Sequence, residues 1–395
     1  MKRVDPLAAI RAFRRRLAAF GGRDAYPPRD GNAVALYVGG GAILEACREL
    51  IRSAARTVDI EMYLWSDDAV GNGMVDLLLE AVRRGVTVRA VYDAIGCIGA
   101  TAHLERLAAG GARVVAFHPF LPWRWRGNPN HRNHRKLLLV DDTAAVLSSA
   151  NWGLDYAPES NPAAFVDAGL GVAGPVVADL AADFRRIFAI VGETLPEPSA
   201  PRPGLPPPGE PIGGVTAQVL SGITRGDRNP IRQVYTFLLK TARSEVVIVN
   251  AYFVPGRRFV RLLGKAAQRG VSVSLHLPGR TDQRFVQAAT RSTYGRLLRA
   301  GVKVFESEAR TIPAKAAWVD GAILVLGSAN IDPRSFVHNL ELNLNVHSPL
   351  LVTSLAVAGA GSLLSGRAVD LAQWQRRPVA TRLLQHLAYQ LRAWL

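Results

Sequence analysis

The sequence predicts an α/β protein made of two similar lobes, and three observations lead to this prediction. Helix-like and strand-like hydrophobic patterns alternate along the 395 residues. A proline-rich stretch divides the chain near its middle, and the segments on either side of it repeat each other. Each lobe is therefore expected to be a mixed sheet flanked by helices.

The elements follow from the spacing of apolar residues. Apolar residues at helical spacing, closed by an Arg-Gly step that is typical of a helix C-terminus, predict helices. Short apolar runs bounded by turn residues predict strands. The helices are expected at about 41–56, 70–84, 229–243 and 256–269, and the strands at 58–64, 87–93, 245–250 and 271–277.

The internal repeat is clearest where polar residues recur. Ala81–Val88 (AVRRGVTV) returns as Ala266–Val273 (AAQRGVSV). Lys136, Asp141 and Asn151 in the first half are matched at identical spacing in the second, by Lys315, Asp320 and Asn330. A repeat of this length indicates an internal duplication.

The proline-rich stretch supplies the boundary between the two units. Eight of the sixteen residues from Pro196 to Pro211 are proline, which predicts an extended linker. The expected organisation is a basic amphipathic segment at 1–34, a first lobe at 35–195, a linker at 196–213, and a second lobe with C-terminal helices at 214–395.

Charge and cysteine content narrow the function. The chain has 48 basic and 32 acidic residues, a net charge of +16, which favours phosphate, nucleic acid or an acidic membrane as partner. Two cysteines, Cys47 and Cys97, are too few for a disulfide framework and are expected to be packed thiols in a reducing compartment. No run reaches the roughly 18 apolar residues that a bilayer span requires.

The N-terminal segment leaves two interpretations open. Ile10, Phe13, Leu17 and Phe20 fall on one helical stripe, and arginines occupy the rest of the circumference. Such a helix can lie on an anionic membrane, or it can dock on its own domain through the same stripe.

The first repeat carries a set of residues suited to phosphodiester chemistry. His134 and Lys136 are two apart on a predicted strand, so they project from the same face. The imidazole can act as a nucleophile, while the lysine stabilises charge on the phosphoryl oxygens. Asp141 ends this strand, and Asn151 can donate a further hydrogen bond to phosphate.

At these residues the chain resembles the phospholipase D superfamily, the HxKxxxxD phosphodiesterases, and is most similar to bacterial cardiolipin synthases. The resemblance covers roughly residues 35 to 390. It is carried by Asn133–Asp141 (NHRKLLLVD), Asn151–Tyr156 (NWGLDY), Tyr252–Pro255 (YFVP), Gly327–Phe336 (GSANIDPRSF) and Asn339–Asn343 (NLELN).

The resemblance implies a mechanism and a set of site residues. Two lobes packed with pseudo-two-fold symmetry would bring both half-motifs into one cleft, without a metal or cofactor, and a monomer would suffice for one site. One histidine would form a phosphohistidine, and the other would act as acid and then base. Asp167 would orient the histidine of the first motif, and Glu341 occupies the equivalent place in the second half. A lipid alcohol as acceptor gives phosphatidyl transfer between phospholipids; water gives hydrolysis.

The second half-motif departs from this pattern. The repeat places the partner of His134 at Pro313, so the second half keeps Lys315, Asp320 and Asn330 without a histidine. Proline has no titratable group, and a positioned general acid–base contributes about 10²–10⁴ in rate. The site is therefore expected to be weakened or inactive. His338 is the nearest candidate substitute, but its strand parity predicts that it faces away.

A segment before the first motif, Pro119–Arg126, interleaves aromatic residues with arginines. This composition suits a membrane interface, stacking on nucleic-acid bases, or a loop packed on its own lobe; His118 and His131 flank it.

Three functions follow from these observations. The first is a phosphatidyltransferase or phospholipase that acts on anionic phospholipid, cytoplasmic and peripheral on the inner membrane. The second is a headgroup-binding pseudoenzyme, for which Pro313 is the argument. The third is a nuclease of the same superfamily; nucleic acid is the less favoured partner, because small nucleases of this family usually carry one motif per chain.

Overall fold

The computed structural model describes residues 26–119, 130–161, 163–196, 206–223, 226–281, 283–307 and 312–392. The expected N-terminal helix, part of the proline-rich linker and all of the aromatic–arginine segment after Pro119 lie outside the described residues. Among the helices of the described ranges, none is both long and apolar enough to cross a bilayer.

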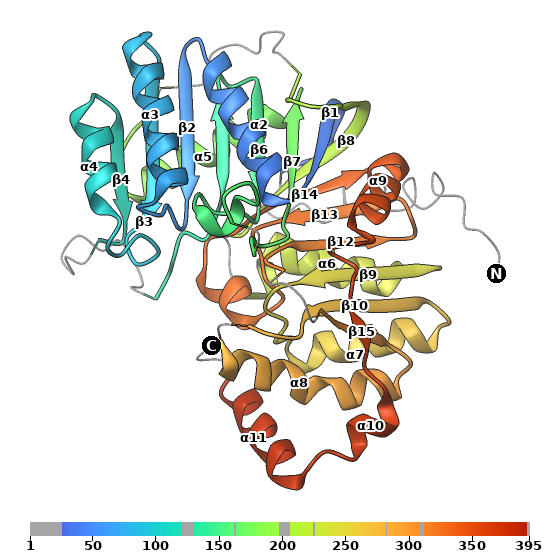
Figure 1. Ribbon diagram of the computed structural model, residues 1–395. Coiled ribbons are helices and arrows are strands. Elements are labelled where there is room, and N and C mark those ends of the chain that lie inside the picture. The colour runs from blue at the N-terminus through green and yellow to red at the C-terminus, as the bar shows by residue number, and fades with distance from the viewer. Residues whose placement is uncertain are drawn as a thin grey trace.

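In the described part of the first lobe, four strands alternate with helices, as the sequence predicts, and three more strands then follow before the last helix (Figure 1). Its strands are β1 (Arg29–Val38), β2 (Thr57–Met62), β3 (Thr87–Asp93), β4 (Arg113–Phe117), β5 (Leu137–Val140), β6 (Ala144–Ser148) and β7 (Ala168–Ala173). Its helices are α2 (Gly40–Ser53), α3 (Ala69–Arg83), α4 (Thr101–Ala109) and α5 (Val176–Ile190), with a short 3₁₀ turn at Leu154–Tyr156.

The second lobe repeats this order and adds a C-terminal extension. Its strands are β8 (Ile212–Ser221), β9 (Glu245–Asn250), β10 (Ser272–Pro278), β11 (Lys303–Ser307), β12 (Lys315–Val319), β13 (Ile323–Gly327), β14 (Leu342–His347) and the short β15 (Arg367–Ala368). Its helices are α6 (Pro230–Thr241), α7 (Arg257–Gln268), α8 (Arg284–Arg299), α9 (Pro349–Gly359), α10 (Leu371–Gln375) and α11 (Val379–Gln390), with short turns at Gly226–Arg228 and Arg334–His338. The helices and strands predicted from periodicity are confirmed to within a few residues.

The sheet topology shows the duplication directly. All the strands form one sheet in the order β15-β11-β10-β9-β12-β13-β14-β8-β1-β7-β6-β5-β2-β3-β4. Outward from the centre, β8-β14-β13-β12-β9-β10-β11 mirrors β1-β7-β6-β5-β2-β3-β4. The two halves meet where β1 pairs antiparallel with β8, so a pseudo-two-fold axis passes through this pair. The lobes therefore share one continuous sheet.

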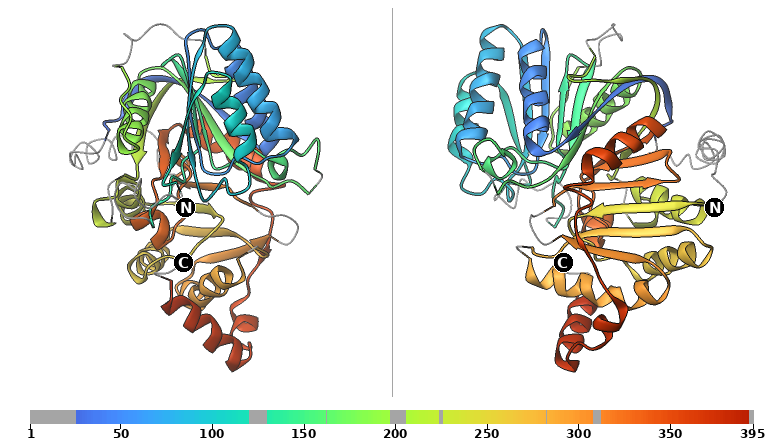
Figure 2. Two further views of the ribbon diagram at one scale, coloured as in Figure 1. Left: turned by 90° about the vertical axis from the view of Figure 1, so that its left-hand side faces the viewer. Right: turned by 45° about the vertical axis from the view of Figure 1, so that its right-hand side comes forward.

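Helices cover both faces of this sheet and define three apolar cores. Helices α2, α3 and α4 bury one face of the first half-sheet, and α6, α7 and α8 bury the corresponding face of the second. Helices α5 and α9 lie over the other faces, where a single core joins residues of both halves. Figure 2 shows α5 on the opposite side of the first half-sheet from α2–α4. The shared core fixes the lobes relative to each other.

The two motif aspartates serve the fold. Asp141 and Asp320 each follow a motif strand in a left-handed backbone conformation, with φ of 54° and 53°. The Asp141 carboxylate accepts from the backbone N–H groups of residues 55, 56 and 57 at the start of β2. Asp320 does the same for residues 243, 244 and 245 at the start of β9. These carboxylates join two chain segments at the far end of the motif strands from His134.

Candidate active site

The first motif brings His134 and Lys136 together and turns Arg135, the residue between them, to the opposite side. His134 and Lys136 lie just before β5, and Lys136 Nζ donates to the backbone oxygen of His134 at 2.6 Å. Arg135 between them is fully buried on the other side, where it forms ion pairs with Glu61 and Asp183. His134 and Lys136 thus lie in an extended segment that leads into β5 and not on the predicted strand itself, and the structure brings them into contact through this hydrogen bond.

The second half repeats this local geometry without the imidazole. Lys315 Nζ donates to the backbone oxygen of Pro313 at 2.5 Å, as Lys136 does to that of His134. Both lysines are almost fully buried, at 3 % and 4 % exposed. Pro313 is also buried. The backbone at position 313 therefore keeps the arrangement that the first half uses for His134.

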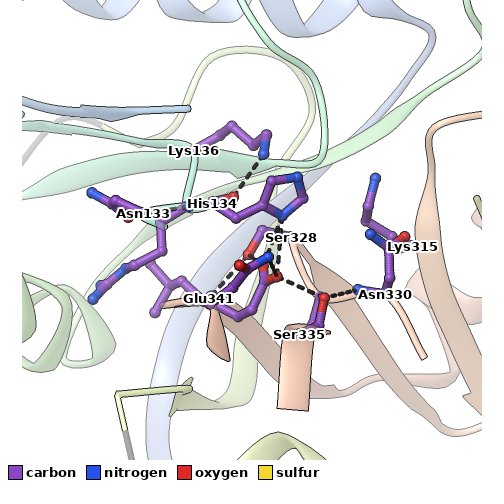
Figure 3. A network of polar contacts seen from close by, with 12 residues as sticks. Asn133, His134, Lys136, Lys315, Ser328, Asn330, Ser335 and Glu341 are labelled. Atoms are coloured by element: carbon purple, nitrogen blue, oxygen red, sulfur yellow. Dashed lines mark hydrogen bonds and ion pairs between the residues drawn. The ribbon is translucent and has the colours of Figure 1, made fainter. Parts of the chain in front are cut away.

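A carboxylate from the second lobe holds His134. Nδ1 of His134 lies 3.1 and 3.0 Å from the two oxygens of Glu341 (Figure 3). The same carboxylate accepts from the hydroxyls of Ser328 and Ser335, at 2.5 and 2.7 Å, and from the Asn339 amide at 3.2 Å. Glu341 is thus a fully buried, fixed acceptor for the His134 ring.

The backbone supports this contact across the lobes. The N–H of His134 donates to the carbonyl of Leu340 at 3.0 Å, and the N–H of Leu340 donates to the carbonyl of Arg132 at 2.8 Å. The residue before Glu341 is therefore paired with the residues around His134. The distance between imidazole and carboxylate is set by main-chain hydrogen bonds.

The electrostatics favour a neutral imidazole. The pKa of His134 is lowered to about 4: burial is the main cause, Glu341 opposes it, and the charges of Lys136 and Lys315 add to the lowering. Burial tends to raise the pKa of Glu341, but His134 and Lys136 outweigh it and keep that pKa below its usual value. An ionised Glu341 can only accept, so Nδ1 carries the proton and Nε2 keeps its lone pair. This is the form of histidine that can attack phosphorus.

The two lysines share one electrostatic environment. Burial lowers the pKa of Lys136 well below its usual value, and the charge of Lys315 lowers it further. Burial also lowers the pKa of Lys315, against the attraction of Asp167 and Glu341. Figure 3 shows the His134 ring between Lys136 and Lys315. A bound phosphodiester anion would stabilise the charged form of both lysines.

Asp167 is the counterpart of Glu341, and one of its carboxylate oxygens lacks a hydrogen-bond partner among the described residues. Its Oδ1 accepts from the Ser149 hydroxyl and from the N–H of Ala168. Its Oδ2 is buried and has no hydrogen-bond partner among the described residues. Burial raises the pKa of Asp167, while Lys315 and Ser149 lower it. A buried orphaned oxygen costs free energy unless something bonds to it.

The expectation that Asp167 orients His134 is wrong, because Glu341 of the other lobe does so. By the pseudo-two-fold relation, Asp167 faces the position of Pro313. The bond from the His134 N–H to Leu340 has no equivalent there, because proline has no N–H. Oδ2 of Asp167 is thus the acceptor that a histidine at position 313 would use.

Two asparagines complete the arrangement. Asn151 Oδ1 accepts from the N–H of Leu64 and Asn330 Oδ1 from that of Tyr252, each at 3.3 Å. The amide nitrogen of Asn151 donates to Tyr156 at 2.9 Å, whereas that of Asn330 makes no hydrogen bond to any described residue. The Asn330 amide remains available as a donor to a phosphoryl oxygen.

The sequence did not identify Tyr63 as part of this site. Its ring meets the His134 ring edge-on at a centroid distance of 4.8 Å, and Lys136 Nζ lies 5.0 Å from its centroid. Tyr63 follows β2 without any motif, so only the folded sheet reveals it. Ser328 could have been found, because the repeat pairs it with Ser149.

Three histidines named in the sequence analysis make other contacts than His134. His338 is half-buried, and its ring lies 6.4 Å from that of His131. The ring of His118 stacks on Phe117, and its Nδ1 lies 3.0 Å from the carbonyl of His131. Among the described residues, none of these rings contacts His134, and no group of three His, Cys, Asp or Glu is placed to hold a metal ion.

This paired arrangement of histidine, lysines and asparagines on a duplicated sheet defines a phospholipase D-type protein. The sequence profile described as "Cardiolipin synthase, PLD-like domain" matches residues 47–186 and 235–358. The chain therefore belongs to this family of phospholipase D-like proteins.

Curated relatives agree with this assignment. The chain is 33 % identical over 320 residues to cardiolipin synthase A of Pseudomonas syringae pv. syringae, covering 80 % of this chain and 66 % of the relative. It is 32 % identical over 329 residues to cardiolipin synthase B of Salmonella typhimurium, covering 81 % and 77 %. It thus spans about two thirds to three quarters of these relatives.

Among solved structures, phosphatidylserine synthase of Haemophilus influenzae Rd KW20 has a TM-score of 0.69 and 14 % identity, over 93 % of this chain and 97 % of that one. Polyphosphate kinase of Porphyromonas gingivalis has a TM-score of 0.55, over 90 % of this chain and 52 % of that one. At these identities the likeness concerns the fold.

Proposed function

We propose that this protein transfers phosphatidyl groups between phospholipids through a phosphohistidine on His134. The observation that carries the proposal is the fixed pair of His134 and Glu341, which leaves Nε2 unprotonated. The names of the relatives, cardiolipin synthases A and B, support phospholipids as substrates.

The first step forms one bond and breaks one. Nε2 of His134 attacks the phosphorus of the donor, and the P–O bond to the leaving alcohol breaks. Lys136 and Lys315 stabilise the non-bridging oxygens, together with the Asn330 amide. The proton on Nδ1 remains in the bond to Glu341, which disperses the positive charge that the ring acquires.

The second step reverses the first with a new alcohol. The acceptor hydroxyl attacks phosphorus, the N–P bond breaks and His134 is regenerated. In both steps a proton must move on the side of the phosphorus opposite His134, where the described residues offer Pro313 in place of an imidazole. We therefore propose that turnover with natural lipids is slow, since the leaving alkoxide departs without a positioned acid.

A second candidate function follows from the same position. Pro313 and the orphaned oxygen of Asp167 are the features expected of a site that binds phosphodiesters without turning them over. In that case the buried lysines hold a phospholipid headgroup. In either function we propose a peripheral association with the cytoplasmic face of the inner membrane, and one chain is enough for one site.

One experiment separates the two functions. The purified protein is incubated with vesicles containing labelled phosphatidylglycerol, and lipid products are resolved; in parallel, an aryl phosphodiester serves as a donor whose leaving group needs no acid. We expect a labelled phosphoprotein with the aryl ester, trapped by alkaline denaturation because the N–P bond is acid-labile. We also expect slow lipid products, and both signals should be absent in His134→Ala. Binding of vesicles with neither signal would favour the headgroup-binding function.

A further inference from the structure

The C-terminal helix α11 turns its large apolar residues away from the protein core. Its buried residues are Gln385, Ala388 and Tyr389, which face α8 and the segment before α7. Its large apolar residues point outward and are between 50 % and 66 % exposed. They form what we call the outer face of α11: Val379, Leu383, Leu384, Leu387 and Leu391.

The helical geometry makes this a single stripe. At 100° per residue, Val379, Leu383, Leu387 and Leu391 repeat every four positions, with Leu384 beside them. A helix that belongs only to a water-soluble surface places its leucines inward. A contiguous apolar face of this kind marks an interaction site.

The surroundings of the outer face are basic. Helix α8, on which α11 packs, carries four arginines and no acidic residue, and α11 has no acidic residue either. Two nearby acidic side chains are already engaged: Glu306 forms an ion pair with Arg291, and Asp370 caps α10. Among the described residues, the surface beside the leucines therefore carries more positive than negative charge.

A cavity of about 690 Å³ opens beside this face, and its lining residues come from α8, from α11 and from α10 with the residues after it. Its lining includes Arg296, Arg299, Arg377 and Arg382. Arg377 lies 3.5 Å above the ring of Trp374, so its position is fixed. The described residues that line this cavity include no carboxylate, and guanidinium groups in such a setting suit the phosphates of anionic lipids.

The inner side of α11 is tied to the candidate active site. The Tyr389 hydroxyl donates to the carbonyl of Pro255 at 2.8 Å. The same short segment contains Tyr252, whose N–H donates to Asn330. Docking through α11 would therefore hold the docked partner close to the residues that receive the phosphodiester.

We infer that α11 is an interfacial helix that docks the protein on an anionic lipid bilayer. The outer face of α11 enters the headgroup–acyl boundary, and the arginine-lined cavity takes lipid phosphate groups. The choice of a lipid surface rests on the proposed function, because a phospholipid substrate lies in a bilayer. The pairing of exposed leucines with arginines points to the same partner independently.

The first test measures vesicle binding of the full chain by cosedimentation. The double variant Leu383→Ser/Leu387→Ser should lower binding to phosphatidylglycerol–phosphatidylcholine vesicles by about 10²-fold, since two exposed leucines no longer insert. Val357→Ser on α9, where the residue is 73 % exposed, is the matched control and should bind as the wild type does. An equal loss in this control would contradict a docking site on α11.

Charge is tested separately. Arg296→Gln/Arg299→Gln/Arg382→Gln should reduce the dependence of binding on phosphatidylglycerol and on salt, whereas Arg83→Gln on the exposed part of α3 should not. Unchanged salt dependence in the triple variant would remove the cavity from the proposal.

Fluorescence measures whether α11 itself inserts into the bilayer. This measurement tests α11 even if another segment of the chain also binds vesicles. Cys47 and Cys97 are buried, so an environment-sensitive probe can be attached selectively to Leu387→Cys. Anionic vesicles should shift its emission to the blue, and should leave a probe on Val357→Cys unchanged. No shift at Leu387→Cys would overturn the inference.

Two further outcomes are distinguishable. If a second copy of the chain covers the outer face, the wild type will be a dimer and Leu383→Ser/Leu387→Ser a monomer with unaltered vesicle binding. If α11 docks but no lipid product forms, the proposed function fails while the docking surface stands. Hydrolysis of a dispersed short-chain phosphodiester should be the same in the wild type and in the α11 variants.

Discussion

Glu341, from the second lobe, accepts the hydrogen bond from Nδ1 of His134, in the first lobe, at 3.0 Å. The histidine of one repeat is therefore oriented by the carboxylate of the other. The active form of either half-motif depends on the packing of both lobes.

Glu341→Gln should lower the rate of phosphohistidine formation by about 10²–10⁴, because the amide no longer fixes the tautomer that exposes Nε2. The measurement is single-turnover labelling with an aryl phosphodiester. Glu105→Gln, an exposed change of the same kind on α4, should have no effect. A full rate in Glu341→Gln would mean that the contact serves folding alone.

Pro313→His should raise turnover of natural lipids by about 10²–10⁴, because the new ring can donate to the free oxygen of Asp167 and protonate the leaving alkoxide. Pro313→Ala is the control, since it restores the backbone N–H without the imidazole. Adding Asp167→Asn to Pro313→His should remove most of the gain. If Pro313→His changes nothing in a protein that already turns over well, another acid is at work, and His338 is the first to mutate.

The pH dependence of the first step should be displaced toward acid. The pKa of His134 is lowered to about 4, so its lone pair stays available well below the ordinary histidine pKa of about 6.5. The rate of phosphohistidine formation should stay level between about pH 5 and about pH 7, the range in which an ordinary histidine titrates. Below about pH 4 the rate should fall by about tenfold per pH unit. A midpoint near the ordinary value would show that the imidazole is solvated.

The same shift has a consequence for stability with a definite sign. Between about pH 4 and about 6.5 the unfolded chain binds a proton at His134 that the folded chain does not. The free energy of unfolding should therefore decrease as pH falls through this window. His134→Gln should show a smaller decrease in urea unfolding measured across the same pH values.

Asp141→Asn should lower the free energy of unfolding by about 1–3 kcal/mol, because it weakens hydrogen bonds from three backbone N–H groups. Activity per folded molecule should be unchanged, since this carboxylate lies at the far end of the motif strand. Asp76→Asn on α3, where the carboxylate is exposed, is the control for urea unfolding. A loss of activity without a loss of stability would contradict the structural role.

Much of the fold and the identity of the site residues could be predicted from sequence, because both leave local signals. The two-residue spacing predicts that His134 lies beside Lys136, and the identical spacing of Lys, Asp and Asn in both halves shows the duplication. The N-terminal helix and the linker boundary remain predictions, since these residues are largely outside the described part of the chain.

What could not be predicted depends on contacts between distant segments. The exchange of carboxylates between lobes, the place of Tyr63 against His134 and the joining of the half-sheets have no local signature. Helix α11 shows the limit most clearly. A leucine stripe in a sequence normally indicates the face that packs on the core, and here the structure places it outside.

The pairing of β1 with β8 means that neither lobe is a complete unit. Separated, each half would present an unpaired edge strand and half of a shared core, a combination that promotes aggregation. Joined, the halves behave as subunits of an obligate heterodimer that happen to be covalently connected. A protease cut between residues 197 and 205 should therefore yield two fragments that migrate together until denatured, with His134 still held by Glu341.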